Sequence, residues 1–241
     1  MSRIKNQQEW EYLGSIDPLF AVLTNQGRKN GRWDVMEFFL TGDQEIKALM
    51  GTCQQLGYPD GRIAALDFGC GVGRLTRALA VYFRDCYGVD VSRTMISKAN
   101  ELNSHVPSCE FIANDQDNLS IFSDNSFDLI YSNLVLQHVY SEHAIISYIQ
   151  EFVRTVKRGG LIVFQLPSRV PFWQRILKPR RNLYAVLRAL GMSERFIYQS
   201  LNLYPITMTS ISRQRVLAQL TTSGAKVLDI RPPDSTYYVT K

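Results

Sequence analysis

One stretch, residues 64–93, constrains the fold of this chain more than any other. It reads as a short apolar run that ends at Asp67, a turn with three glycines, a helical pattern that begins near Arg74, and a second apolar run that ends at Asp90. The glycines let the backbone approach a ligand closely, and the helix behind them presents free N–H groups. Because an acid at the end of the second strand can accept the hydroxyls of a ribose, the stretch predicts an α/β fold with a site for a nucleotide-type cofactor.

The composition is that of a globular protein with an ample core. The chain has 241 residues, of which 45% are hydrophobic and 20% charged, and this suits one α/β domain with an elaboration. No apolar run approaches the roughly 18 residues of a membrane span. The first residues are polar and do not resemble a secretory signal. We therefore expect a cytoplasmic protein.

The cysteines and histidines form no recognisable disulfide or metal pattern. The four cysteines are spread singly, without a C-x-x-C pair, and the three histidines show no ligand spacing with them. These residues are Cys53, Cys70, Cys86 and Cys109, with His105, His138 and His143. Reduced thiols are therefore expected, with neither a disulfide nor a metal site.

The net charge of +5 is unevenly distributed along the chain. Between Glu151 and Glu194 the chain has nine bases and no acid, so the remainder is net negative. The nine bases are Arg154, Lys157, Arg158, Arg169, Arg175, Lys178, Arg180, Arg181 and Arg188. Interleaved with aromatic residues, they would suit a phosphate, an RNA or an anionic membrane surface. A solvated helix face balanced by acids elsewhere in the fold explains them equally well.

Residues 1–60 are expected to form a helical extension before the cofactor unit. A short helix should begin at Pro18, and a second helix, capped at 41–43, should follow the aromatic run 33–40. Two interpretations of that run remain open: it packs the extension on the sheet, or it belongs to a lid over the cofactor. One segment could do both. The aromatic side chains concerned are Trp33, Phe38 and Phe39.

Apolar runs continue to alternate with amphipathic helices after Asp90. Strands are expected at 109–113, 127–132, 161–166, 226–230 and 236–240, and helices after Ser92, across 140–156 and across 212–222. Residues 168–210 interrupt this alternation and predict one or two helices with a break at Lys178-Pro179, and then another helix. This segment is interpreted as an insertion and not as a second domain.

Three details narrow the choice of cofactor. Gly69, Gly71 and Gly73 have the spacing G-x-G-x-G, which differs from the G-x-G-x-x-G of dinucleotide sites. Asp67, two residues before the first glycine, would repel a pyrophosphate but attract an ammonium group. The polar pair 114–115 ends the next strand, where it could reach the amine of an adenine.

With these details the chain resembles the class I S-adenosylmethionine-dependent methyltransferases. D-F-G-C-G-V-G-R is similar to the first motif of that family and G-V-D-V-S to the second, and three further segments follow in the family's order: N-D-Q-D-N-L-S, S-F-D-L-I-Y-S-N-L-V-L-Q-H-V and K-R-G-G-L-I-V-F. The resemblance covers residues 60–167, and more loosely the last helix and two strands. It implies an α/β, Rossmann-like, seven-stranded mixed sheet of order 3-2-1-4-5-7-6, with the last strand antiparallel and helices on both faces. The domain would span 61–241, after the extension or lid 1–60, with 168–210 as a helical insertion on the acceptor side.

The resemblance also implies a set of residues that hold S-adenosylmethionine, with S-adenosylhomocysteine as product and no metal. Asp67 would meet the amino group, Asp90 both ribose hydroxyls, and the pair Asn114 and Asp115 the edge of the adenine. The whole set is Asp67, Gly69, Cys70, Gly71, Gly73, Arg74, Asp90, Val91, Met95, Asn114, Asp115, Ser132, Asn133 and Leu134. The last three would flank the sulfonium.

The candidate general base is His138, at the open end of the predicted sheet, since histidine side chains titrate near neutral pH. In a second interpretation, His138 and Gln137 only begin a helix and orient the loop. The segment Y-S-N-L differs from the N-P-P-[YF] motif of amino-methylating DNA enzymes and lacks the cysteine of cytosine C5 enzymes. A nucleic-acid base is therefore disfavoured as the acceptor.

We therefore expect methylation of an O or N atom of a small molecule, of sugar, lipid-linked or secondary-metabolite type. Its pocket would include Trp33, Gln137, Phe172 and Trp173. The alternative is an RNA- or protein-directed methyltransferase, or a non-catalytic cofactor-binding module, that uses the basic segment 154–188. Contact of that segment with a membrane surface stays open, and the sequence does not indicate an oligomeric state.

Overall fold

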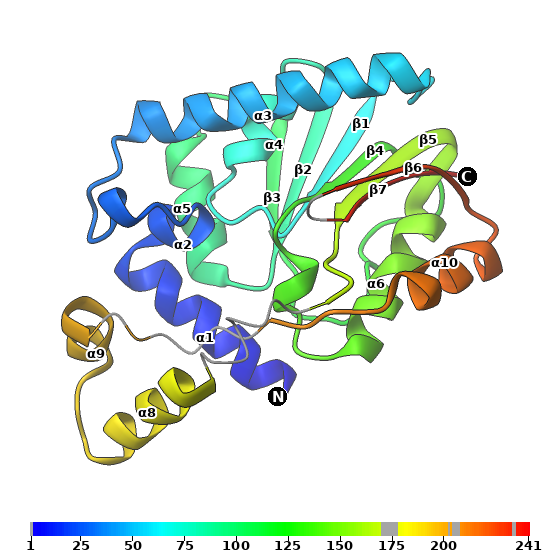
Figure 1. Ribbon diagram of the computed structural model, residues 1–241. Helices are drawn as coiled ribbons and strands as arrows, with labels where there is room; N and C mark the ends of the chain where they lie inside the picture. Colours follow the sequence, from blue (N-terminus) through cyan, green and yellow to red (C-terminus); the bar gives the residue numbers. More distant parts are fainter. Residues whose placement is uncertain (1, 170–177, 202, 204–207, 233–234) are drawn as a thin grey trace.

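The computed structural model describes the chain except for residues 1, 170–177, 202, 204–207 and 233–234 (Figure 1). Seven strands form one mixed sheet in the order β3-β2-β1-β4-β5-β7-β6. The first five strands pair in parallel, whereas β7 is antiparallel to both β5 and β6. This confirms the predicted order. The strands are β1 (Ala64–Phe68), β2 (Asp85–Asp90), β3 (Cys109–Ala113), β4 (Phe127–Ser132), β5 (Val156–Gln165), β6 (Lys226–Arg231) and β7 (Thr236–Thr240).

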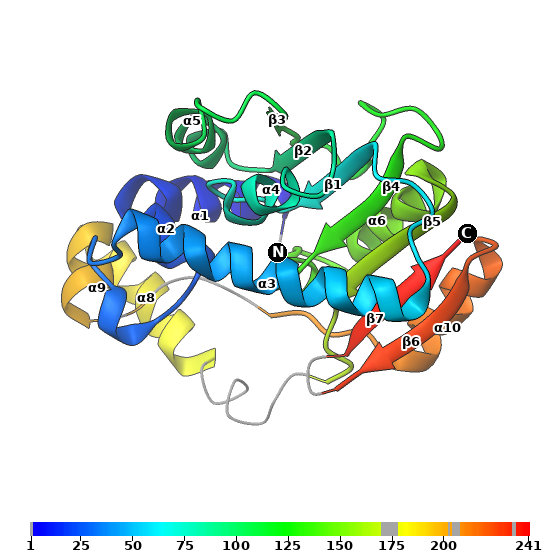
Figure 2. The same ribbon diagram turned by 90° about the horizontal axis from the view of Figure 1, so that it is seen from above.

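Helices cover both faces of the sheet, because side chains alternate along each strand between two apolar layers. On one face, Ala65 and Leu129 pack with α3 (Val35–Leu56) and α4 (Arg74–Leu79). On the other face, Leu66 and Ile130 pack with α6 (Glu142–Thr155) and α10 (Arg213–Thr222). Figures 1 and 2 show the long helix α3 running across the strands. The remaining elements of this core are α5 (Arg93–Leu102) and η2 (Leu136–His138).

The N-terminal extension is helical, with α1 (Arg3–Ile16), α2 (Pro18–Val22) and η1 (Gln26–Arg28) before α3. The aromatic run packs this extension on the rest of the chain. Phe38 and Phe39 are fully buried beside Val72 and Met95, and the ring of Trp33 meets Phe38 edge-on at 5.6 Å. Proline at the first position of α2 begins that helix, as predicted.

The expected second helix start at 41–43 is wrong. Helix α3 begins after Asp34, whose side chain accepts a hydrogen bond from the N–H of Glu37, and continues without interruption to Leu56. The reason for Gly42 inside this helix is packing. A Cβ at position 42 would lie 2.6 Å from the carbonyl oxygen of Arg74, so glycine allows α3 to cross α4 closely.

The boundary between α6 and β5 also differs from the expectation. Helix α6 ends at Thr155 and β5 begins immediately at Val156, so the pair Gly159-Gly160 lies inside the strand instead of ending the helix. The pairing of β4 with β5 shifts register before Leu161, where regular pairing resumes. The two glycines therefore lie at an irregularity in the pairing of β5.

The insertion contains α8 (Lys178–Ala189) and α9 (Glu194–Leu201). Both agree with helices expected there, and α8 begins at the predicted break. The expected helical stretch before Lys178 falls outside the described residues for 170–177. In the described part of the chain, no helix is long and apolar enough to cross a membrane.

The crossing of α3 and α4 predicts opposite effects for two alanine substitutions in one helix. Gly42→Ala should lower the free energy of unfolding by about 1–3 kcal/mol, because its Cβ has no room beside Arg74. Gly51→Ala should raise it by up to ~1 kcal/mol, since nothing lies within 4 Å of that Cβ and alanine favours helix. Urea denaturation followed by circular dichroism measures both. Equal effects of the two substitutions would contradict the packing explanation.

Candidate active site

The candidate active site is a cavity at the carboxyl ends of β1, β2 and β4, covered by α1 and α2. Its empty space, including the part open to solvent, is about 1100 Å³. The residues that line it on the core side include Gly69, Asp90, Asn114, Leu134 and His138. Three segments that are distant in sequence therefore meet in one space, at the edge where parallel α/β sheets bind ligands.

The glycine-rich turn forms the floor of this cavity. Gly69 and Gly71 have φ values of 79° and 53°, which only glycine adopts readily. Their surroundings also exclude a side chain, since a Cβ would lie 2.3 Å from Val135 at the first position and 2.3 Å from Val22 at the second. Between them, burial raises the pKa of Cys70 well above its usual range. This cysteine is therefore an uncharged wall residue and not a nucleophile.

Asp90 connects the glycine turn to the loop after β2. One carboxylate oxygen accepts a hydrogen bond of 2.9 Å from the N–H of Gly71, and the other accepts one of 2.9 Å from the N–H of Ser92. Burial raises the pKa of Asp90, although both hydrogen bonds oppose this shift. The side chain is thus held on the cavity wall with lone pairs left for further donors, as a ribose requires.

Asp67 does not line the cavity. It is 2% exposed and accepts a hydrogen bond of 2.7 Å from the hydroxyl of Thr76 in α4, while burial raises its pKa to about 7. The structure therefore places Asp67 behind the turn instead of against an amino group. Gly73 and Ser132, two further predicted cofactor residues, also lie outside the cavity wall. Direct contact of these three residues with the cofactor stays a prediction.

Arg74 and Asn133 do line the cavity, and both are held by one residue that the sequence did not single out, Glu45 of α3. One oxygen of Glu45 accepts from the Arg74 guanidinium at 2.8 Å, and the other accepts from Asn133 at 2.8 Å and from the Tyr131 hydroxyl at 2.9 Å. Burial raises the pKa of Tyr131, so the phenol remains a donor. Glu45 was recognisable as an acid on the apolar side of α3, four residues before Leu49.

The guanidinium of Arg74 has spare hydrogen-bonding capacity. Arg74 is 4% exposed, and its Nε is buried with no hydrogen-bond partner among the described residues. A buried donor of this kind on the cavity wall suits a carboxylate ligand, because an unsatisfied charged donor is costly.

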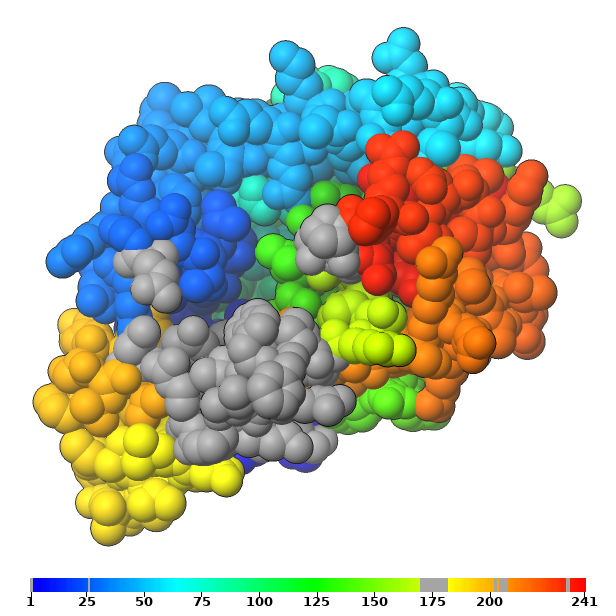
Figure 3. Space-filling view, in the orientation of Figure 1, coloured from blue at the N-terminus to red at the C-terminus, as the bar shows by residue number. Residues whose placement is uncertain are grey.

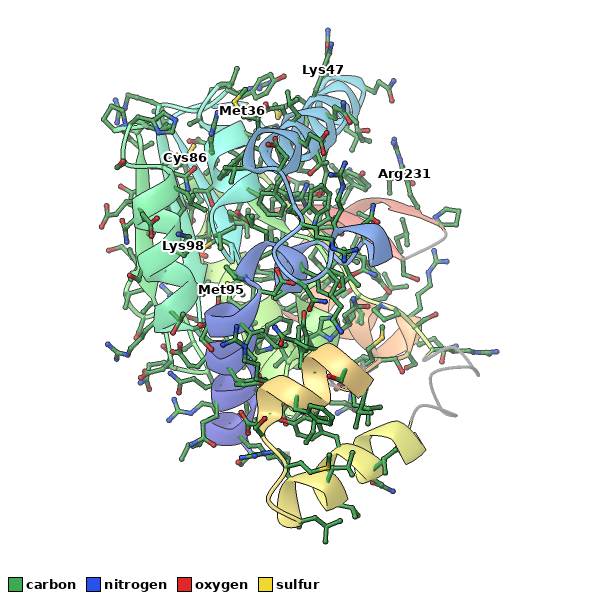
Figure 4. All side chains as sticks on the ribbon, turned by 90° about the vertical axis from the view of Figure 1, so that its left-hand side faces the viewer. Met36, Lys47, Cys86, Met95, Lys98 and Arg231 are labelled. Carbon is green, nitrogen blue, oxygen red and sulfur yellow. The ribbon has the colours of Figure 1, made fainter. Side chains whose placement is uncertain are left out.

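The end of the cavity formed by the loops after β2 and β3 carries both polar and apolar side chains. The backbone N–H of Asn114 donates to the carbonyl of Asp90, and its side chain donates to Asn118 at 2.8 Å, which orders the loop after β3. Asp115 also lines the cavity, as do Val91 and Met95. Met95 is 2% exposed and lies between α5 and the N-terminal helices (Figure 4). This end therefore combines apolar surface with amide and carboxylate groups, which fits a purine.

Helix α1 covers the cavity through contacts with its rim. Asn6 donates to the carbonyl of His138 at 3.0 Å, Gln7 donates to that of Val91 at 3.2 Å, and Arg3 donates to that of Asp115. The loops after β2, β3 and β4 are thus each bonded to α1. Trp10 adds an edge-on ring contact with His138 at 5.7 Å.

An acid of α1 also caps α5. The carboxylate of Glu11 accepts hydrogen bonds from the N–H groups of Arg93 and Thr94, at 2.6 and 2.9 Å, and from the hydroxyl of Ser92. Burial alone would raise the pKa of Glu11, but these hydrogen bonds lower it below its usual value. The cap stabilises the position of α1 over the cavity, because a carboxylate is stabilised at a helix N-terminus.

The residues after β4 lie at the junction of the cofactor and acceptor regions. Leu134 has a φ of 61°, an unfavourable value for a branched side chain, and it lines the cavity beside His138. Nε2 of Gln137 lies 3.2 Å from Nε2 of His138. Gln137 itself is buried outside the cavity wall, as is the half-buried Trp33, so the structure does not place these two expected acceptor residues there. Phe172 and Trp173 lie outside the described residues.

No cluster of three or more potential metal ligands occurs in the described ranges of the chain. The four cysteines are free thiols. The basic residues 154–188 are partly neutralised within the fold. Arg154 pairs with Glu151 and Asp124, and Lys157 pairs with Asp128 at 2.9 Å.

Comparison with known proteins is consistent with this site. Residues 66–164 match the family model described as a methyltransferase domain. Phosphoethanolamine N-methyltransferase 1 of Zea mays is 32% identical over 101 residues, which cover 42% of this chain and 20% of that enzyme. The chain thus matches about a fifth of the length of that relative.

Solved structures with the same fold cover nearly the whole chain. Magnesium protoporphyrin IX methyltransferase of Synechocystis PCC 6803, solved with bound S-adenosylhomocysteine, has a TM-score of 0.61 and 16% identity, and the match covers 99% of each chain. Phosphoethanolamine N-methyltransferase 1 of Haemonchus contortus has a TM-score of 0.64 and 15% identity, over 99% of this chain and 48% of that one. Residues 66–164 thus match a methyltransferase domain, and the chain as a whole has the fold of these solved methyltransferases.

The role of Glu45 can be tested by removing its charge. In Glu45→Gln, Arg74 loses its charged partner and its fixed orientation, so we expect the affinity for S-adenosylhomocysteine to fall about tenfold by isothermal titration calorimetry. Glu37→Gln is the matched control, because Glu37 lies on the same helix and pairs with Arg28 away from the cavity. If both variants bind as tightly as the wild type, Glu45 does not organise the site.

Proposed function

We propose that this chain is a methyltransferase that binds S-adenosylmethionine in the cavity and transfers its methyl group to an O or N atom of a small molecule. The observation that carries the proposal is the enclosure of the glycine turn, Asp90 and His138 in one space beneath α1. A donor site and a candidate base thus share a cavity with limited access. The acceptor is proposed to be of sugar, lipid-linked or secondary-metabolite type.

The residues present fit the proposed cofactor. Asp90 has lone pairs for the ribose hydroxyls, and the unpartnered Nε of Arg74 suits the methionine carboxylate. The polar loop with Asn114 and Asp115, facing the apolar side chain of Met95, suits the adenine. When bound, the cofactor supplies an electrophilic methyl group on a sulfonium.

The chain's contribution to the reaction is alignment and proton removal. The glycine turn and Leu134, with its strained backbone, would position the methyl donor beside the acceptor. Alignment of two reactants in this way lowers a barrier by roughly 7–11 kcal/mol. Helix α1 covers the cavity by bonding its rim. His138, which lines the same cavity, would accept the proton of an acceptor hydroxyl or ammonium.

Two observations favour a small acceptor over RNA or protein. Helix α1 lies over the cavity, which leaves little room for a polymer to reach His138. Three of the basic residues proposed for a polymer, Arg154, Lys157 and Arg188, are paired with acids of the same chain. The names of the maize and Haemonchus enzymes also refer to a small acceptor, phosphoethanolamine.

Transfer of a labelled methyl group tests the proposal. The protein is incubated with methyl-tritiated S-adenosylmethionine and a cell extract separated into low-mass, RNA and protein fractions. We expect label in the low-mass fraction, and none with Asp90→Ala, which lacks the ribose acceptor. Label confined to RNA or protein would contradict a small acceptor, and no transfer into any fraction would contradict the methyltransferase proposal.

The role of His138 is tested with the acceptor found in this way. If the acceptor loses a proton, His138→Ala should lower kcat by about 10²–10⁴-fold, the usual contribution of a general base, and change affinity for S-adenosylhomocysteine less than twofold. His143→Ala, an exposed position on α6, is the control. Unchanged turnover and cofactor affinity in His138→Ala would show that His138 only orients the loop.

A further inference from the structure

Helix α8 presents its apolar side to solvent and its polar side to the protein. Leu183 and Val186 of α8, and Leu190 directly after its end, follow helical spacing and are 48%, 54% and 73% exposed. On the opposite side, Tyr184 and Arg188 line a pocket against α1. This is the reverse of the usual orientation of a surface helix, in which the apolar stripe packs on the core.

The orientation of α8 is fixed by the helix that follows it. Ile197 and Tyr198 of α9 are 0% and 1% exposed, and Tyr198 packs in a cluster with Leu13 of α1 and Phe20 of α2. Lys29 donates to the carbonyl of Tyr198 at 2.7 Å. Arg188 of α8 pairs with Glu194 of α9, so α8 is connected to this anchored helix.

The exposed apolar side chains of the two helices form one surface, named here the α8–α9 face. It consists of Leu183, Val186, Leu190, Phe196 and Leu201. The two helices occupy one corner of the molecule, coloured yellow and gold in Figure 3. Several large exposed apolar side chains in one corner of the fold indicate an interaction site.

The segment that carries this face has an excess of bases in its sequence. Residues 178–201 contain five bases and one acid, Glu194, and that acid is paired with Arg188 at 3.0 Å. Arg195 is exposed at the start of α9. An apolar stripe combined with an excess of lysine and arginine is the pattern of a helix that lies in the interface of an anionic lipid bilayer.

We propose that the α8–α9 face docks on the surface of an anionic lipid bilayer, with its apolar side chains in the acyl boundary and its bases near the headgroups. RNA would complement the bases but would leave the leucine and valine side chains in water. A second copy of the chain would bring two positive faces together, which is unfavourable. A bilayer with anionic lipids satisfies both the charge and the apolar surface.

Docking would place the candidate active site close to the membrane. Helices α8 and α9 lie against α1, the helix that covers the cavity, and pocket residues of α1 and α8 face each other. An acceptor held in the bilayer would therefore reach the cavity over a short path. The proposed docking itself does not depend on methyl transfer, since it is measured without cofactor or acceptor.

Sedimentation of the full-length chain with vesicles tests the docking. We expect binding to vesicles of phosphatidylcholine with phosphatidylserine, weaker binding to phosphatidylcholine alone, and a decrease with salt. The double variant Val186→Gln/Leu190→Gln should lower the partition coefficient about tenfold or more. Arg195→Gln should lower it about fivefold, as expected for one basic residue near a charged surface.

Matched controls distinguish vesicle binding through this face from nonspecific binding through other exposed residues. Met36→Gln and Val81→Gln change apolar residues that are 74% and 76% exposed elsewhere, and should leave binding within twofold. Lys47→Gln removes an exposed base of α3, at the opposite end of the molecule from α8 in Figure 4, and should also have little effect.

Three outcomes would overturn the proposal. The first is no binding to either kind of vesicle. The second is binding that the α8–α9 variants and the control variants reduce equally. The third is binding of RNA, or self-association measured by light scattering, that is lost in Val186→Gln/Leu190→Gln while vesicle binding is unchanged.

Discussion

The carboxylate of Asp90 is the interaction on which the site depends. Its two oxygens accept hydrogen bonds from Gly71 and Ser92, so one side chain joins the turn after β1 to the loop after β2. The pairing of β1 with β2 brings these loops together, because Phe68 is opposite Val89 in the parallel register. The left-handed backbone at Gly69 and Gly71 then allows the turn to pass under Val135 and Val22 without a clash. Sheet register, glycine conformation and one carboxylate together form the floor of the cavity.

The N-terminal extension completes the site through two acids. Glu45 of α3 holds Arg74 and Asn133 from one side, and Glu11 of α1 caps α5 on the other. In both cases a carboxylate of the extension satisfies N–H or O–H donors of the sheet domain that would otherwise need water. The extension is therefore a structural part of the cavity as well as its cover. Opening of α1 for cofactor exchange would have to break the contacts of Arg3, Asn6 and Gln7 with the rim.

Local patterns were sufficient to predict the sheet and much of the cofactor region. The order of apolar runs and the glycine turn indicated the strands, and Asp90, Asn114 and His138 do line one cavity. Features that depend on contacts between distant elements were missed. Gly42 suggested a break between two helices, but it lies inside α3 and allows α3 to cross α4 closely. Asp67 was expected beside the ligand, and its carboxylate accepts a hydrogen bond from Thr76. A lid over the cofactor was one interpretation of the aromatic run 33–40, but the contacts with the cavity rim come from α1, which the sequence did not single out.

The most direct test of the cavity as a cofactor site is calorimetric titration of the chain with S-adenosylhomocysteine, for the wild type and for Asp90→Asn. We predict saturable one-to-one binding by the wild type and at least a tenfold loss of affinity in Asp90→Asn, with an unchanged circular dichroism spectrum, because the amide accepts ribose hydroxyls less strongly than the carboxylate. No binding by the folded wild type, or equal affinity of the two proteins, would contradict the assignment of this cavity to the methyl donor.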